Sequence, residues 1–394
     1  MNALKGPISA DAAITEYQKK RRDKINGGYT ELAITYEEEG AKAPKVAAKK
    51  AKKTSKLPGG LQRLIDLIFD TKQINHAMKE IGYDAKKMPL GKLGESTIKD
   101  AYKVLNDLEK ALKRGAKDEV KTLSSRFYSL IPHDFGRANM SNFVLDCEEK
   151  IKHKLDMLQS LSDMKITSKL LDTTEADTDI IDQNYKKLGC KLRPLAATEE
   201  IHNMVSTYVA NTRGNYKPQI EDIFEVVREQ EHKEFNSKLG NNLLLWHGSG
   251  VANFVGILSQ GLRIAPPEAP ASGYLFGKGI YLADMFEKSA MYCRGSDDGS
   301  YLILLVEGAL GQMNILTRPD CGAKELMEKA KKNSTKCHGG KAPPPSSYKK
   351  FSSFSIPLGK VDETKSGSYK GHNEFIVYQK NQARLRYLIR YRLK

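Results

Sequence analysis

Three short segments in the C-terminal half carry side chains that could act on a sugar: Trp-His-Gly-Ser at 246–249, Gly-Lys-Gly-Ile-Tyr-Leu-Ala-Asp at 277–284 and Asn-Glu-Phe-Ile-Val-Tyr at 373–378. A carboxylate such as Glu374 can support a ribose carbon that becomes oxocarbenium-like as a leaving group departs. A glycine such as Gly248 has no Cβ, so a planar amide can approach its backbone N–H and C=O. Each segment alone also fits a structural role, as a satisfied histidine, a packed strand tyrosine or an exposed strand carboxylate.

The joint pattern is more specific than its parts. In order and spacing, His247, Tyr281 and Glu374 resemble the three signature positions of the ADP-ribosyltransferases. The flanking segments resemble the catalytic domain of the poly(ADP-ribose) polymerases, most closely the DNA-damage-responsive type, and the resemblance covers residues 56–394 almost continuously. It implies an enzyme, a pentosyl-transferring glycosyltransferase whose substrate is NAD+. Nicotinamide would be released, and ADP-ribose would pass to protein acceptors, including the enzyme itself, and to growing poly(ADP-ribose).

The resemblance also implies a role for each residue of the site. The predicted catalytic residues are Glu374, His247 and Tyr281. Glu374 would bind the nicotinamide ribose and orient the acceptor hydroxyl, which permits elongation, while His247 would bind the adenine ribose. The residues predicted to hold the nicotinamide end are Gly248 for the carboxamide, Ser289 as a donor to its oxygen, and Tyr281 with Tyr292 stacking on the ring. The residues predicted to line the adenosine side are Ser249, Asn253 and Arg263.

The glycine-rich run at 273–279 does not match the motifs of other nucleotide-binding sites. It lacks the Gly-Lys-Ser/Thr ending of a P-loop, and 277–282 lacks the third glycine of a dinucleotide fingerprint. The proline-rich stretch before it, 265–270, resembles the loop that closes over NAD+ in the family. Two alternatives stay open: a mono-ADP-ribosyltransferase or NAD+ glycohydrolase, and a catalytically silent NAD- or chromatin-binding module.

Composition predicts a protein of the cytosol or nucleus without a membrane partner, and the resemblance implies the nucleus. The chain of 394 residues is 40% hydrophobic and 28% charged, and no apolar run has membrane-spanning or signal-peptide length. The five cysteines form no Cys-x-x-Cys pair, which predicts neither disulfides nor a metal site. The net charge of +16 is concentrated in lysine-rich stretches at 42–56 and 324–350. The first predicts a disordered linker with weak, sequence-blind DNA contacts, and the second a long surface insertion between strands.

Four regions follow along the chain. Residues 1–40 resemble the end of a WGR domain, with a helix-then-strand pattern but without the Trp-Gly-Arg motif, so the chain is either a fragment or carries a remnant of that module. Residues 41–56 are the basic linker. Apolar residues at helical spacing predict an all-α bundle at 57–188, which resembles the autoinhibitory regulatory domain of the family. Short apolar strands predict an α+β ADP-ribosyltransferase domain with mixed or antiparallel sheets at 189–394.

Two finer expectations concern these last two regions. The resemblance places acids from one regulatory helix against the NAD+ site, at positions that here are Asp156, Gln159 and Asp163, and Gln159 departs from the acid expected. At the C-terminus, apolar residues alternate with arginines from 384 to 393, which predicts a strand with one buried face.

Overall fold

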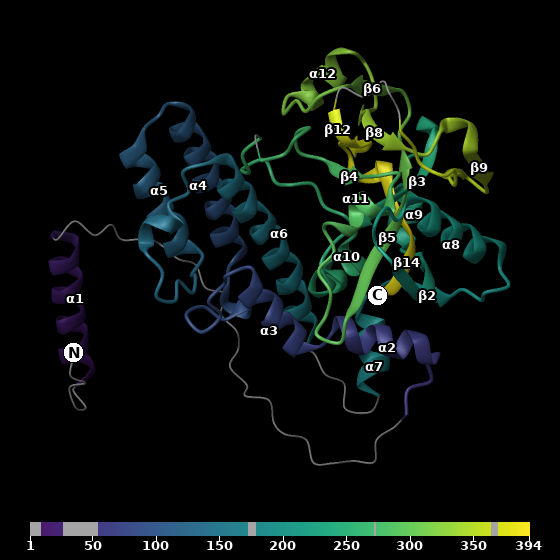
Figure 1. Ribbon diagram of the computed structural model, residues 1–394. Helices are drawn as coiled ribbons and strands as arrows, with labels where there is room; N and C mark the ends of the chain where they lie inside the picture. The colour runs from purple at the N-terminus through teal and green to yellow at the C-terminus, as the bar shows by residue number, and fades with distance from the viewer. Residues whose placement is uncertain (1–8, 27–53, 172–178, 272, 364–368) are drawn as a thin grey trace.

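A computed structural model of the chain describes residues 9–26, 54–171, 179–271, 273–363 and 369–394. Most helices of the first half lie together on one side of the molecule, and the sheets of the second half lie on the other, with helix α6 between them (Figure 1). The arrangement confirms the predicted fold class, a helical region followed by an α+β domain with mixed sheets. Among the described helices, none has the length and apolar character needed to cross a membrane.

The first half is helical where the apolar spacing predicts it. Its elements are α1 (Ala10–Asn26), α2 (Gly59–Ile68), α3 (Thr71–Glu80), η1 (Leu90–Lys92), α4 (Glu95–Lys113), α5 (Lys117–Leu130), η2 (Met140–Phe143), α6 (Glu148–Leu171) and α7 (Ile180–Lys187). Helix α1 occupies the start of the region predicted as a WGR remnant. The strand expected after it, and nearly all of the predicted basic linker, lie outside the described residues.

Helices α3 to α6 form one helical core, whereas α2 and α7 pack elsewhere. Residues 98–108 of α4 and 155–161 of α6 pack together in it. The apolar face of α2, including Leu64 and Ile65, instead packs into the core of the second half, against residues such as Phe224 and Val255. Helix α7 contacts α2 there. The two ends of the helical region are therefore anchored on the α+β domain, which helical periodicity alone cannot reveal.

The described residues of the second half form three sheets. Their strands are β1 (Lys191–Pro194), β2 (Pro218–Val227), β3 (Asn242–Gly248), β4 (Ile280–Leu282), β5 (Ser300–Ala309), β6 (Met313–Leu316), β7 (Ser334–Cys337), β8 (Gly339–Ala342), β9 (Tyr348–Phe351), β10 (Phe354–Pro357), β11 (Asp362–Glu363), β12 (Tyr369–His372), β13 (Glu374–Val377) and β14 (Ala383–Leu393). The strand orders are β1-β2-β14-β5-β3-β10-β9, β4-β13-β7-β6 and β11-β8-β12. The helical segments among them are α8 (Glu200–Thr212), α9 (Glu229–Glu234), η3 (Ser237–Leu239), η4 (Val251–Asn253), α10 (Phe254–Gln260), α11 (Phe286–Ala290), α12 (Ala323–Lys329), η5 (Pro345–Ser347) and η6 (Lys380–Gln382).

The large sheet is buried on both faces at its centre. Alternate residues of β3 enter different cores: Leu243 and Leu245 pack with α2 and α10, whereas Leu244 and Trp246 pack with α8 and α11. The same alternation runs along β5. Burial on both faces explains why these strands are continuous apolar runs. It also makes the end of β3, where the predicted site begins, a rigid support.

Two predictions about strands are wrong in detail. Strand β14 is buried on both faces over most of its length, because two of its arginines are buried in ion pairs: Arg384 with the buried Glu307, and Arg390 with Asp222 at 2.5 Å. The lysine-rich stretch 324–350 is not only a surface insertion, since it contains α12 and the fully buried strand β7. The ammonium of Lys336 lies 5.1 Å from the Phe375 ring centroid, so a lysine is accommodated inside a strand.

Candidate active site

The site begins where β3 meets the four-stranded sheet. Trp246 and Ala283 exchange two backbone hydrogen bonds, of 2.7 and 3.0 Å, which join the sheets just before His247. His247 Nδ1 lies 2.9 Å from the carbonyl oxygen of Tyr281, and since a carbonyl only accepts, Nδ1 carries the proton. Burial lowers the pKa of His247. The ring is therefore neutral, with Nε2 as a hydrogen-bond acceptor for a ligand.

Gly248 occupies a position that no other residue fits. A Cβ built there would lie 1.9 Å from the backbone oxygen of Ser289 and 3.1 Å from Cys293 Sγ. The end of β3 and helix α11 thus touch backbone to backbone, and Ser289 is brought beside Gly248. The contact requires glycine for close packing as well as for the predicted amide binding.

Tyr281 is fixed by its hydroxyl. Oη donates to the carbonyl of Gly277 at 2.7 Å and accepts from the amide of Phe276 at 2.9 Å, so the glycine-rich segment wraps around it. Burial raises the pKa of this phenol, which stays protonated. Strand β4 then pairs with β13, with Tyr281 opposite Ile376. The tyrosine and the glutamate of the predicted set therefore come from adjacent strands.

Glu374 is a buried carboxylate paired with one cation. Its side chain is 4% exposed, and Oε1 lies 3.1 Å from the ammonium of Lys288 on α11 without forming a well-aligned hydrogen bond. Burial lowers the pKa of Lys288, but the charges of Glu374 and Tyr292 and the hydrogen bonds to them together outweigh that effect, and the net pKa is raised. Lys288 also lies 5.5 Å from the Tyr292 ring centroid, which ties that exposed tyrosine to the pair. The carboxylate retains capacity to accept a hydrogen bond from a ligand hydroxyl.

The residue before Glu374 anchors its strand. Asn373 donates to Asp284 Oδ2 at 2.7 Å and accepts from the amide of Gly339 at 2.9 Å. Burial raises the pKa of the fully buried Asp284 to about 7, although the hydrogen bond from Asn373 opposes the shift. Asp284 Oδ1 has no hydrogen-bond partner among the described residues. The hydrogen bond between Asn373 and Asp284 fixes the start of β13, and it places an acidic side chain in the interior.

The predicted adenosine side contacts the helical region. Asn253 donates to Ser249 Oγ at 3.0 Å and to Ser160 Oγ of α6 at 3.3 Å. Arg263 donates to the buried carboxylate of Asp163, also on α6. Burial raises the pKa of Asp163, against the lowering effect of the Arg263 charge. Helix α6 therefore holds side chains at this end of the site.

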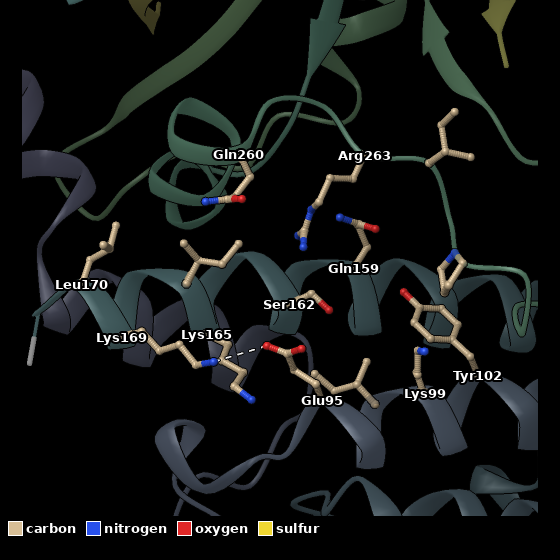
Figure 2. A pocket seen from close by; sticks show the side chains of 14 residues that line it. Glu95, Lys99, Tyr102, Gln159, Ser162, Lys165, Lys169, Leu170, Gln260 and Arg263 are labelled. Carbon is tan, nitrogen blue, oxygen red and sulfur yellow. Dashed lines mark hydrogen bonds and ion pairs between the residues drawn. The ribbon is translucent and has the colours of Figure 1, made fainter. Parts of the chain in front are cut away.

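A pocket of about 560 Å³ lies at this junction. Figure 2 shows Arg263 reaching from the segment after α10 toward α6, with Gln159 and Ser162 beside it and Tyr102 of α4 below. The pocket lining combines apolar surface with three lysines, Arg263 and one carboxylate. The carboxylate belongs to Glu95, which is paired with Lys169 at 3.2 Å. The pocket suits a ligand with a flat apolar part and negative charge.

The predicted residues therefore form two groups. One group gathers around the end of β3 and α11: His247, Gly248, Tyr281, Ser289, Tyr292 and Glu374. The other links to α6: Ser249, Asn253 and Arg263. Of the three regulatory positions, Asp163 contacts Arg263 and Gln159 contacts Asp163 at 3.2 Å, whereas Asp156 is exposed beside Lys152.

Sequence reasoning missed Lys288 and the Asp284–Asn373 pair. Lys288 stands directly before Ser289, so its place on the helix that carries a predicted ligand-binding serine was a usable signal. Asp284 and Asn373 each flank a predicted motif, but their hydrogen bond joins residues 89 apart, which only the fold shows.

Two regions of the chain match models of one protein family. Residues 198–393 match the family profile described as the poly(ADP-ribose) polymerase catalytic domain, and residues 55–185 match the regulatory domain of the same family. The chain is 40% identical to Poly [ADP-ribose] polymerase 2-A of Oryza sativa subsp. japonica over 98% of this chain and 62% of the relative. It is 38% identical to Poly [ADP-ribose] polymerase 2 of Arabidopsis thaliana (98% and 65%) and 37% identical to Poly [ADP-ribose] polymerase 2 of Homo sapiens (94% and 66%). The chain thus spans less than two thirds of the length of these relatives.

Proposed function

This chain belongs to the poly(ADP-ribose) polymerase family, and we propose that it cleaves NAD+, releases nicotinamide and transfers ADP-ribose to protein acceptors and to growing polymer. The observation that carries the proposal is the buried Glu374, which is paired with Lys288 on the helix whose Ser289 backbone touches Gly248, while His247 is bonded to Tyr281 on the strand next to Glu374. That arrangement fits NAD+ in two respects. The backbone of Gly248 is a cradle without room for a Cβ, and the carboxylate of Glu374 has an oxygen left for a hydroxyl.

Each side chain then has a step to perform. The nicotinamide carboxamide binds the backbone of Gly248, Ser289 donates to its oxygen, and the Tyr281 ring packs on the pyridinium. The neutral His247 accepts a hydrogen bond from a hydroxyl of the adenine ribose through Nε2. Glu374 accepts from the nicotinamide ribose, and its charge favours the oxocarbenium-like carbon as the leaving group departs neutral. Lys288 holds the carboxylate in place.

Elongation follows from the position of Glu374. The second oxygen of the same carboxylate can orient the hydroxyl of an incoming ADP-ribose unit toward the reacting carbon. Growth of a polymer needs such an orienting group for every added unit. A mono-ADP-ribosyltransferase or a glycohydrolase needs the carboxylate only to bind the ribose.

The helical region restrains the adenosine side. Asp163 and Ser160 hold Arg263 and Asn253, and a Cβ at Gly256 would lie 2.7 Å from Asp163 Oδ1, so α6 packs directly on α10. NAD+ that uses Arg263 must compete with Asp163. The resulting autoinhibition is a population shift between a form in which α6 is docked and a form in which it has moved away.

We further propose nuclear localisation, automodification, binding to poly(ADP-ribose) and weak DNA binding. The DNA contacts would come from the basic segments, chiefly the lysines at 42–56, nearly all of which lie outside the described residues. Lysine–phosphate contacts without base readout weaken steeply with salt and do not distinguish DNA structures. We expect intact and nicked duplexes to bind alike and to activate little at physiological salt. Strong activation by nicked DNA alone at that salt would overturn this part.

Incubation of the purified chain with NAD+ labelled in the adenylate part, with nicotinamide release measured in parallel, tests the proposed function. We expect release together with label on the protein in a ladder of lengths. Release without protein label would identify a glycohydrolase, and a single unit per site a mono-ADP-ribosyltransferase. No release would identify a silent binding module.

A further inference from the structure

A second charged pair lies beside Glu374 and Lys288. His372 Nε2 lies 3.0 Å from Glu287 Oε2, and the two side chains are only 16% and 21% exposed. A carboxylate only accepts hydrogen bonds, so Nε2 carries the proton and donates a hydrogen bond to Glu287. Within the described residues, the structure gives the other ring nitrogen, Nδ1, no hydrogen bond. It is free to accept a proton.

The glutamate of this pair is held from a third element. The amide of Asn215 donates to Glu287 Oε1 at 3.3 Å, and a Cβ at Gly214 would lie 2.1 Å from the Glu287 carboxylate. The loop after α8 thus fits closely around Glu287. A carboxylate fixed in this way sets the orientation and tautomer of the histidine bonded to it.

The pair is adjacent to the reacting centre. His372 ends β12, two residues before Glu374, and residues two apart along an extended chain point to the same side. Consecutive residues of α11 bind them: Glu287 contacts His372, and Lys288 contacts Glu374. The opposite side of the chain is occupied by Asn373, which turns to Asp284. The imidazole and the Glu374 carboxylate are therefore each bound by one of two neighbouring side chains of α11.

The chemistry of the acceptor gives this placement a consequence. An alcohol must lose its proton as it attacks the ribose carbon, because its pKa lies far above neutrality. A carboxylate acceptor is already ionised at neutral pH and needs no base. In the proposed function Glu374 binds the donor ribose with one oxygen and orients the incoming hydroxyl with the other, so it does not also take the acceptor proton. A second base beside it would serve the incoming hydroxyl.

Resting on the proposed function, we propose that His372 is the base for hydroxyl acceptors, positioned by Glu287. The acceptor oxygen forms a bond to the ribose carbon as the bond from that carbon to the nicotinamide nitrogen breaks. Nicotinamide leaves as a neutral molecule. The acceptor proton passes to His372 Nδ1, and the resulting imidazolium is stabilised by Glu287. The acceptor class is an alcohol, either a serine side chain or a ribose hydroxyl of the polymer.

Two acceptor peptides that differ only in one residue, serine or glutamate, test the proposal with the full chain. Transfer of ADP-ribose to each peptide, the length of polymer on the enzyme and nicotinamide release are measured for wild type, His372→Gln and Glu287→Gln. We expect His372→Gln to lower transfer to the serine peptide by ~10²–10⁴-fold and transfer to the glutamate peptide by less than ~5-fold. Shorter polymer would show that the ribose hydroxyl uses the same base. Glu287→Gln should give a smaller loss for serine, because the imidazole remains.

The pH profile separates a base from a structural residue. Transfer to the serine peptide should rise with pH in wild type as the base loses its proton, and this limb should be absent in His372→Gln. The other charged or titratable groups near the pair are Lys288, Glu374, Tyr216 and, opposite His372 on β8, Lys341. The matched control is His153→Gln, an exposed histidine on α6, which should leave every rate unchanged.

Every outcome bears on the proposal. Equal loss for both peptides, no loss for either, a retained pH limb in His372→Gln, or a wild type that modifies only the glutamate peptide would overturn it. Nicotinamide release by wild type together with any of these results would leave the proposed function standing. Absence of nicotinamide release from wild type would remove both.

Discussion

Replacement of Gly248 by alanine has a consequence that can be worked out from one contact. The new Cβ would lie 1.9 Å from the Ser289 carbonyl oxygen, whereas real Cβ contacts essentially never fall below 3.0 Å. Strand β3 and helix α11 must therefore separate by ~1.1 Å or more, and the flexible end of a side chain cannot absorb the movement because both groups are backbone. Overpacking of this size costs ~1–3 kcal/mol of stability.

The larger effect should be on activity. Helix α11 carries Ser289 and Lys288, and Lys288 holds Glu374, so one displacement moves both ends of the proposed nicotinamide site. A misplacement of ~1 Å in a positioned site can lower the rate by ~10²-fold. We expect the Gly248→Ala protein to fold, with a lower melting temperature, and to release nicotinamide at least ~10²-fold more slowly.

The matched control is Gly250→Ala, two residues after Gly248 and just beyond the end of β3. A Cβ there would meet Arg294 Cβ at 3.5 Å, an ordinary contact, and the backbone φ of −70° accepts any residue. Steady-state nicotinamide release and thermal unfolding of both variants are compared with wild type. Near-normal activity of Gly248→Ala, or an equal loss in Gly250→Ala, would refute the reasoning.

Two further predictions concern buried acids. Asp163→Asn should release Arg263 and raise basal activity, measured as the initial rate without DNA, by ~5–150-fold, which is the range of a ~1–3 kcal/mol coupling. The control is Asp156→Asn, at an exposed position of the same helix. Equal rates in the two variants would contradict the restraint. Burial raises the folded-state pKa of Asp284 to about 7. Between about pH 4 and 7 the carboxyl of Asp284 therefore binds fewer protons in the unfolded chain than in the folded one. The free energy of unfolding must then fall as pH rises through that window. Thermal unfolding from pH 5 to 8 should show wild type losing stability, on the order of 2–4 kcal/mol, and Asp284→Asn losing much less; parallel pH curves would show that Asp284 is not the group responsible.

The parts of the fold that the sequence predicted are those set by local pattern. Helical spacing of apolar residues located α4 and α6, and the apolar runs located β3 and β5, because periodicity and burial coincide there. Helix α2 has an equally clear apolar face, yet its partner is the α+β core. A periodic face indicates that a helix is buried but not against what.

The errors arose where charge was taken as a sign of exposure. The arginines of β14 are neutralised by acids from β2 and β5, and Lys336 lies against an aromatic ring, so these strands are buried despite their basic character. The same limit applies to the site. Spacing and family resemblance assembled the histidine, tyrosine and glutamate, but the lysine paired with Glu374 depends on a contact across 86 positions, which no local pattern contains.

The role of Glu374 is the central claim, and Glu374→Gln tests it most directly. The substitution keeps the side-chain shape and removes the charge, so NAD+ should still bind, as measured by calorimetry or by NAD+-induced thermal stabilisation. On a gel with labelled NAD+, we predict that the ladder of polymer lengths made by wild type collapses to single ADP-ribose units or disappears in favour of slow NAD+ hydrolysis. Polymer of wild-type length made by Glu374→Gln would contradict the claim.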